Sequence, residues 1–128
     1  MKKGITIGMD LGDKKHQVCI LDKTGKIIAE EKVAGTRAAM ASFFKRYRGA
    51  MVAMEAGTHS RWVSQIAKTE GLEVLVGNAR KLRMIWQSRQ KSDTRDAVML
   101  ARIARMDPEL RCPIRHRGEQ VQMDLEII

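Results

Sequence analysis

The chain has 128 residues, of which 44% are hydrophobic and 30% are charged, and these values are typical of one soluble globular domain. Its formal net charge of +9 and its pI near 10.0 favour a polyanionic partner, nucleic acid before an anionic membrane. Cys19 and Cys112 fit no zinc-binding spacing, and no apolar stretch reaches the roughly 18 residues of a membrane span. We therefore expect a reducing, cytoplasmic setting and no membrane partner.

The N-terminal third predicts a β-meander. Residues 5–10 are a short apolar run that suits a central strand, and residues 16–21 alternate as a half-buried strand does. The stretch Asp22-Lys23-Thr24-Gly25 is typical of a hairpin turn. Residues 26–33 then predict a third strand.

Helices and strands alternate after the meander. A helix begins after the candidate N-cap Thr36, and residues 50–54 predict a fourth strand. Apolar residues recur at helical spacing over residues 62–67, and Gly71 ends that helix. Residues 72–76 predict a fifth strand.

Two more helices follow the fifth strand. Leu82 and Trp86 mark the apolar side of one helix, whose opposite side is basic. Ser92 is a candidate N-cap for the other, in which small apolar residues recur at helical spacing as far as Ala104. The predicted order β-β-β-α-β-α-β-α-α indicates an α/β fold with a mixed sheet.

The predicted domain ends near residue 106. Asp107-Pro108 breaks the last helix, and residues 107–118 predict an irregular connector. Residues 119–128 have the pattern of a helix that is just under way. We therefore expect one domain over residues 1–106 and the start of a helical segment over residues 119–128.

Four acidic residues stand at the ends of predicted elements. Asp10 and Glu55 each end a strand, while Asp93 and Asp96 lie three apart at a helix start and project from nearly one face. Sites in such sheets form outside the carboxyl ends of strands, and Mg²⁺ prefers oxygen ligands. Singly, each acid suits a turn, a solvated strand end or a helix dipole. Together, in a basic chain, they favour a metal-dependent enzyme that acts on a phosphodiester backbone.

Basic residues near these acids are candidates for contact with nucleic-acid phosphates, because Arg and Lys side chains match phosphate oxygens. A solvated turn or helix face is the plainer interpretation of each. The candidates are Lys14, Lys15, Arg80, Lys81, Arg83, Lys91 and Arg95. His59, four residues after Glu55, is more often a polar loop residue than part of a site.

Five stretches carry a family resemblance: Gly8-Met9-Asp10-Leu11-Gly12, Met54-Glu55-Ala56-Gly57, residues 75–81, Lys91-Ser92-Asp93-Thr94-Arg95-Asp96-Ala97 and residues 113–117. Over nearly its whole length, the chain resembles the N-terminal domain of the DEDD transposases of the insertion sequence 110 family. The resemblance implies a ribonuclease H-like (RuvC-like) fold. It also implies that Asp10, Glu55, Asp93 and Asp96 are catalytic and bind Mg²⁺ (or Mn²⁺).

The resemblance further implies Mg²⁺-dependent DNA strand cleavage and exchange in transposition, with a structured guide RNA as a partner and a homo-oligomer in the full-length protein. Such proteins act at the nucleoid, in the cytoplasm of bacteria or archaea. The resemblance makes residues 1–106 the catalytic domain, and family members continue into a helical coiled-coil segment and a second domain with a nucleophilic serine. We therefore expect residues 119–128 to be the start of a truncated coiled-coil segment, and this chain to be incomplete for transposition.

Three alternatives stay open. A stand-alone nuclease of the Holliday-junction type would use the same fold and metals, with water as the nucleophile. A non-catalytic, basic nucleic-acid-binding remnant would keep the acids for structure only. An actin-like ATPase or sugar kinase, suggested by Asp10-Leu11-Gly12, needs two such domains and is disfavoured by size.

Overall fold

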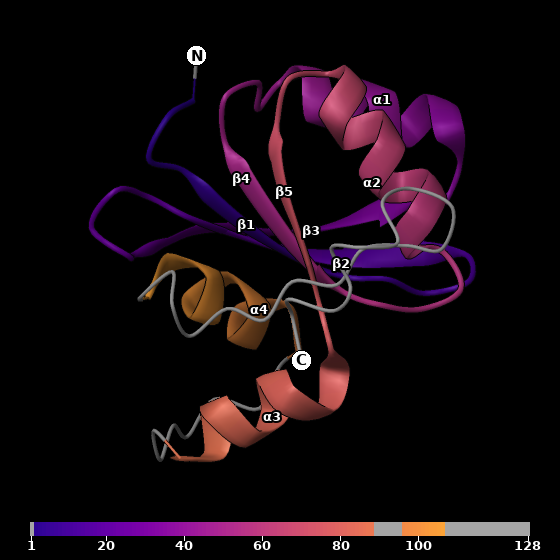
Figure 1. The fold of residues 1–128 in the computed structure, drawn as a ribbon. Coiled ribbons are helices and arrows are strands. Elements are labelled where there is room, and N and C mark those ends of the chain that lie inside the picture. Colours follow the sequence, from indigo (N-terminus) through magenta and orange to yellow (C-terminus); the bar gives the residue numbers. More distant parts are fainter. Residues whose placement is uncertain (1, 89–95, 107–128) are drawn as a thin grey trace, which may run out of the picture.

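The structure is a computed structural model and describes residues 2–88 and 96–106 (Figure 1). The elements in this part of the chain are β1 (Thr6–Asp10), β2 (Lys15–Leu21), β3 (Ile27–Ala34), α1 (Arg37–Lys45), β4 (Met51–Glu55), α2 (Ser60–Thr69), β5 (Glu73–Gly77), α3 (Ala79–Ser88) and α4 (Asp96–Arg105). The strands form one sheet in the order β3-β2-β1-β4-β5. The predicted α/β fold class and element order are therefore confirmed.

The sheet is mixed, as predicted. The pairs β1–β2 and β2–β3 are antiparallel, as in a meander, while β4 and β5 continue the sheet parallel to β1. The predicted strand ends differ from the observed ones by about one residue, which is the usual uncertainty of element boundaries. Ser92 and the segments 107–118 and 119–128 lie outside the described residues, which end at the predicted boundary, residue 106.

The two faces of the sheet are covered by different helices. Figure 1 shows α1 and α2 on one side and α4 on the other. Because side chains alternate along a strand, Ile7 and Met9 of β1 join the core under α1 and α2. Ala53 of β4 packs instead against Leu100 and other apolar residues of α4. Asp10 and Glu55 lie in register with the α4 side of this alternation.

Gly8 allows α4 to lie directly on the centre of the sheet. A Cβ atom at Gly8 would collide with the backbone of Ala97 and Ala101, two small residues of α4. Only a glycine permits an approach this close. The contact brings the first turn of α4, which begins with Asp96, beside the carboxyl end of β1.

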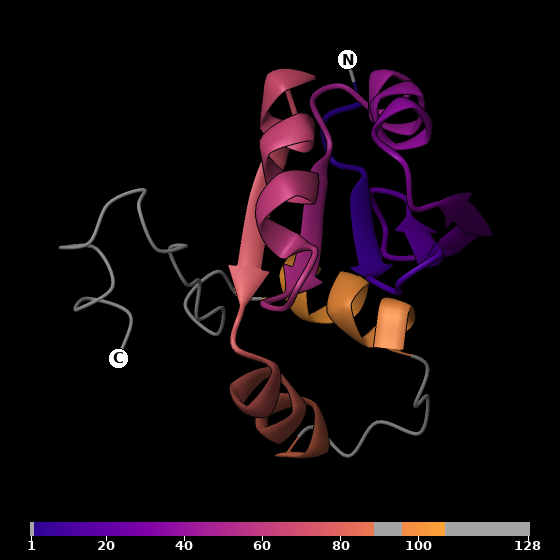
Figure 2. The same cartoon turned by 90° about the vertical axis from the view of Figure 1, so that its right-hand side faces the viewer.

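Helix α3 leaves the end of β5 and lies on the same side of the sheet as α4 (Figure 2). The side chain of Asn78 accepts a hydrogen bond from the Lys81 backbone N–H at 3.0 Å and so caps the helix. Leu82 and Trp86 are buried against the α4 side of the core, which confirms that Trp86 packs in the core. No helix in the described part of the chain is long and apolar enough to cross a membrane.

Candidate functional site

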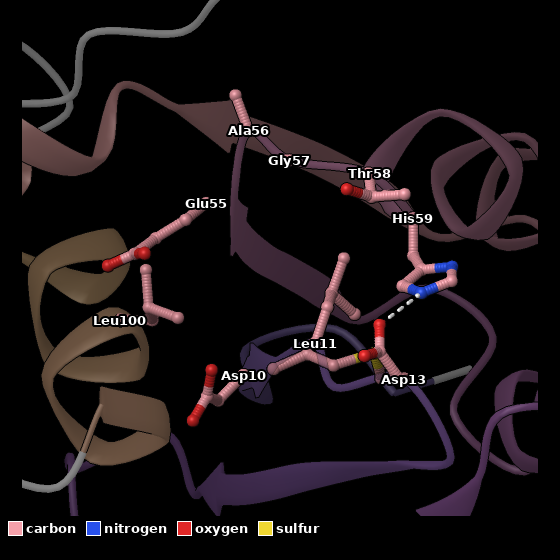
Figure 3. Close-up of a pocket in the computed structure, with 10 residues that line it drawn as sticks. Asp10, Leu11, Asp13, Glu55, Ala56, Gly57, Thr58, His59 and Leu100 are labelled. Atoms are coloured by element: carbon pink, nitrogen blue, oxygen red, sulfur yellow. Dashed lines mark hydrogen bonds and ion pairs between the residues drawn. The ribbon is translucent and has the colours of Figure 1, made fainter.

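Asp10 and Glu55 lie side by side at the end of the sheet. The parallel register of β1 and β4 pairs Met9 with Met54, and the two acids are the next residues of their strands. Figure 3 shows both carboxylates turned toward α4, on either side of Leu100. Asp96, at the start of α4, adds a third carboxylate. The structure therefore brings together three of the four predicted site acids, and Asp93 lies outside the described residues.

Arg83 of α3 bridges two of these carboxylates. Its Nη1 atom lies 3.1 Å from Asp96 Oδ1, and its Nη2 atom lies 3.2 Å from Glu55 Oε1. A second contact of 3.4 Å joins Nη2 to Asp96 Oδ2. One guanidinium therefore joins α3, α4 and β4 at the site. Sequence reasoning placed Arg83 among the phosphate-binding candidates and did not predict these carboxylate partners.

The site carries more negative than positive charge. Burial raises the pKa of Asp10, the neighbouring Asp96 carboxylate raises it further, and Arg83 opposes this change. The pKa of Glu55 is raised mainly by burial, with Arg83 acting in the opposite direction and Asp96 and Asp10 adding to the increase. Both carboxylates are therefore harder to ionise here than in water, and a bound cation would favour their charged form.

Glu55 Oε1 is a buried oxygen that lies within ion-pair distance of Arg83. It has no hydrogen-bond partner among the described residues. Arg83 Nη2 donates its hydrogen bond to the other carboxylate oxygen, Oε2, at 3.4 Å, so its contact with Oε1 is an ion pair without hydrogen-bond geometry. A buried carboxylate oxygen whose lone pairs accept no hydrogen bond among the described residues fits a hard divalent cation.

The site is not arranged as a closed metal cage. Within the described residues, no three side chains of the metal-binding types lie close enough together to hold an ion. The donor set nevertheless fits Mg²⁺, because all three acids offer carboxylate oxygens. Arg83 lies between Glu55 and Asp96 and contacts both carboxylates.

A pocket of about 170 Å³ opens beside the acids. Figure 3 shows its lining, in which Asp10 and Glu55 lie toward α4 and Asp13 and His59 lie at the opposite end. His59 Nδ1 accepts a hydrogen bond from the Trp62 indole at 3.1 Å, and Nε2 lies 3.2 Å from Asp13 Oδ1. Because Nδ1 accepts, Nε2 carries the proton of the neutral ring and donates to Asp13. Both ring nitrogens of His59 are thus engaged at the pocket rim.

His16 is a residue that sequence reasoning missed. It is fully buried, and its Nδ1 accepts a hydrogen bond of 3.1 Å from the Gly12 backbone N–H. This bond fixes the loop that follows Asp10. The signal was available in the alternation of residues 16–21, which places His16 on the core side of its strand together with Val18.

The predicted phosphate-binding residues lie around this end of the sheet. Lys14 and Lys15 are exposed in and just after the β1–β2 loop, which begins at Asp10, and Arg80 and Lys81 are exposed in the first turn of α3. Lys91 and Arg95 lie outside the described residues. A second hollow, of about 220 Å³, is lined by both Asp10 and Asp96.

Comparisons with known proteins identify the family. A family model for the DEDD transposases of insertion sequence 110, described as "Transposase", matches residues 7–126. None of the curated proteins matches. Among solved structures, the Thermus thermophilus RuvC structure is similar, with a TM-score of 0.57 and 15% identity over 81% of this chain and 97% of that chain. At this identity the likeness shows the fold, which is RuvC-like as predicted. The chain belongs to the DEDD transposase family of insertion sequence 110.

Proposed function

We propose that this chain is the N-terminal catalytic domain of a DNA transposase, which cleaves and exchanges DNA strands with the help of Mg²⁺ (or Mn²⁺). One observation carries the proposal. The carboxylates of Asp10, Glu55 and Asp96 converge at one end of the sheet, in a chain that belongs to a transposase family. Rigid strands and a packed helix supply all three, and this suits a site that has to be precise.

Asp10, Glu55 and Asp96 would hold the metal, and Asp93 joins them on its position in the Lys91–Ala97 motif. When bound, the metal supplies Lewis-acid stabilisation of the charge that develops on the phosphodiester. The protein's own residues would orient the nucleic acid and exclude water. Leu100 and the residues of the β4–α2 turn wall the pocket, and the Gly12–His16 hydrogen bond holds the loop beside it.

Basic residues would hold the nucleic-acid backbone against the acids. We assign this role to Lys14, Lys15, Arg80 and Lys81, which are exposed near the site, and to Lys91 and Arg95 on their positions in the sequence. Arg83, the remaining candidate, contacts Glu55 and Asp96 in the structure. Phosphate contacts of this kind position the nucleic acid but carry no sequence information.

Sequence information would then reside in a structured guide RNA that pairs with the DNA, as the family resemblance implies. We further propose that residues 1–106 form the domain and residues 107–118 the connector, and that a coiled-coil segment starts at residue 119. Homo-oligomerisation and the serine-bearing domain would complete strand exchange in the full-length protein, in the bacterial or archaeal cytoplasm.

The test is the melting temperature of the chain with and without millimolar Mg²⁺ or Mn²⁺, for the native protein and for Asp10→Asn. A ligand at 100 times its dissociation constant stabilises a protein by about 2.7 kcal/mol. We expect the native chain to melt at a higher temperature with metal and Asp10→Asn to show no such rise. Asp13→Asn is the matched control, because it removes a carboxylate from the loop that follows Asp10. The Asp13 side chain is 96% exposed, so this variant should keep the metal-dependent rise in melting temperature.

An equal rise in native protein and Asp10→Asn would contradict the assigned metal site. The absence of a rise in the native chain, combined with salt-sensitive DNA binding that ignores Mg²⁺, would favour the non-catalytic binding remnant.

A second candidate is a stand-alone junction nuclease. The observation that favours it is that the fold likeness extends over 97% of the Thermus thermophilus RuvC chain. Metal-dependent nicking of a four-way DNA junction by this chain alone, lost in Asp10→Asn, would support the nuclease over the transposase domain.

A further inference from the structure

Arg83 places a guanidinium among the site acids. Its guanidinium contacts Asp96 with both Nη atoms and Glu55 with one, at 3.1–3.4 Å. The residue comes from α3, whereas its partners come from α4 and β4. No local sequence rule requires such a contact. Its partners are two of the carboxylates assigned above to the metal.

A guanidinium and a metal ion cannot use these oxygens in the same way. Mg²⁺ binds oxygen ligands at about 2.0–2.1 Å in near-octahedral geometry. The guanidinium is a broad planar group that holds Glu55 and Asp96 apart at hydrogen-bond distances. With Arg83 in place, these two carboxylates are at least partly neutralised. Binding of a divalent cation between them therefore requires Arg83 to leave.

Arg83 is able to leave without unpacking its helix. Leu82 and Trp86, which anchor α3 to the core, are only 5% and 6% exposed. The side chain of Arg83 is 47% exposed, and the neighbouring Met84 is exposed as well. A rotation about the Arg83 side-chain bonds therefore moves the guanidinium into solvent while the apolar side of α3 stays buried.

Once released, Arg83 joins a basic surface. Arg80 and Lys81 are exposed on the same helix, and together the three residues present positive charge to a phosphate backbone. The same guanidinium thus has two alternative anionic partners, the site carboxylates and nucleic-acid phosphate.

We propose that Arg83 is a built-in competitor for the metal site: it neutralises Glu55 and Asp96 in the metal-free protein, and metal binding displaces it toward the nucleic-acid backbone. This inference rests on the proposed function, because it needs the acids to bind metal. Its consequence is that metal occupancy and phosphate binding through Arg83 support each other, as thermodynamic linkage requires.

The first measurement is Mn²⁺ affinity, read from the electron paramagnetic resonance signal of free Mn²⁺ during titration of the whole chain. We compare the native protein with Arg83→Gln, Arg83→Lys, Arg80→Gln and Asp10→Asn. Arg83→Gln should bind Mn²⁺ about fivefold more tightly, equivalent to about 1 kcal/mol. Arg80→Gln removes the same charge from an exposed position on the same helix and should change the affinity less than twofold, roughly.

Arg83→Lys keeps the charge but loses the two-armed contact, so its affinity should lie between those of the native protein and Arg83→Gln. It carries the test if Arg83→Gln does not fold. Native-like or weaker Mn²⁺ binding in the folded Arg83 variants would overturn the proposal that Arg83 competes with the metal, provided that Asp10→Asn loses Mn²⁺ binding. If Asp10→Asn binds Mn²⁺ as the native chain does, the proposed metal site itself is wrong. Absence of binding in both the native chain and Arg83→Gln would reject both proposals.

The second measurement is the salt dependence of binding to a short fluorescent DNA duplex, at fixed Mn²⁺ and without metal. Loss of one phosphate contact lowers the slope of log affinity against log salt by about 1. We expect Arg83→Gln to show this loss only with Mn²⁺ present. An equal loss with and without Mn²⁺ would mean that Arg83 contacts phosphate independently of the metal, and would overturn the linkage.

Discussion

His16 shows how one buried residue supports the loop that follows a site acid. It is fully buried, and its Nδ1 is occupied by the Gly12 backbone N–H. Its Nε2 has no hydrogen-bond partner in the described part of the chain. Burial lowers the pKa of His16 from its ordinary value of 6.5, and the nearby His59 lowers it further. The fold therefore favours the neutral ring, which leaves Nδ1 free to accept from Gly12.

This protonation state makes stability depend on pH. The pKa of His16 is lower in the folded than in the unfolded chain. Protonation of His16 therefore costs no stability above pH 6.5, and the free energy of unfolding falls as the pH drops from there through the folded pKa. We expect urea midpoints of the native protein to fall below pH 6.5 in this way. His16→Gln keeps a hydrogen-bond acceptor but does not titrate, so its midpoint should fall less over the same range.

His59→Gln is the control for this experiment. It leaves His16 and its burial intact, so most of the pH dependence should remain. If His16→Gln and the native protein lose stability in parallel between pH 6.5 and 5, then other groups cause the loss and the account of His16 is wrong.

At the scale of elements, the contact between β1 and α4 decides where the third carboxylate lies. Gly8 lets the backbone of α4 approach the strand. Ala97 and Ala101, on the facing side of α4, have small side chains that permit the same approach. Asp96 reaches the end of the sheet only because α4 lies this close. Gly8, the first glycine of the stretch Gly8-Met9-Asp10-Leu11-Gly12, therefore has a packing role that is distinct from the chemistry of Asp10.

Gly8→Ala tests this contact. Its Cβ would collide with the backbone of Ala97 and Ala101, so α4 has to move. Overpacking of this kind costs about 1–3 kcal/mol, and we expect a corresponding loss in the free energy of unfolding, measured in urea. Mn²⁺ affinity should also fall, because Asp96 moves with the helix.

Gly57→Ala is the matched control for Gly8→Ala. A Cβ at Gly57 meets no atom within 4 Å, and a tolerated Gly→Ala change is neutral or stabilising by about 0.4–1 kcal/mol. Equal losses of stability in both variants would show that the close approach of α4 is not what requires Gly8.

Elements and strand ends were predictable because they follow from local pattern. Alternation and turn signals located the strands to about one residue, and the ends of two strands located Asp10 and Glu55. The bridge from Arg83 to Asp96 and Glu55 was not predictable, since it joins residues of different elements through long side chains. The role of Gly8 was hidden for the same reason, because it depends on how α4 packs and not on its own neighbours in sequence.

At the scale of the whole molecule, the larger apolar core and the acidic site lie on opposite faces of the sheet. The larger apolar core lies between the sheet and helices α1 and α2, and it includes Met40 and Phe44 of α1. The acids and Arg83 lie on the α4 side, at the carboxyl ends of the parallel strands, which is where sites form in such sheets. Only the strands themselves belong to both sides. Alternate side chains of each strand point to the two faces of the sheet. A substitution in the core under α1 and α2 therefore alters the acidic site only if it moves the strand backbone.

Met40→Ala tests this separation. Met40 is fully buried on α1, and truncation of such a residue costs about 2–5 kcal/mol. We expect a loss of that size in the free energy of unfolding, while the Mn²⁺ affinity of the folded protein, measured well below its melting temperature, stays native. Gly8→Ala should show the opposite pairing, a smaller loss of stability with weaker Mn²⁺ binding. If Met40→Ala weakened Mn²⁺ binding as much as Gly8→Ala does, the two faces of the sheet would be mechanically coupled, and the site would depend on the whole core and not on the contact between β1 and α4.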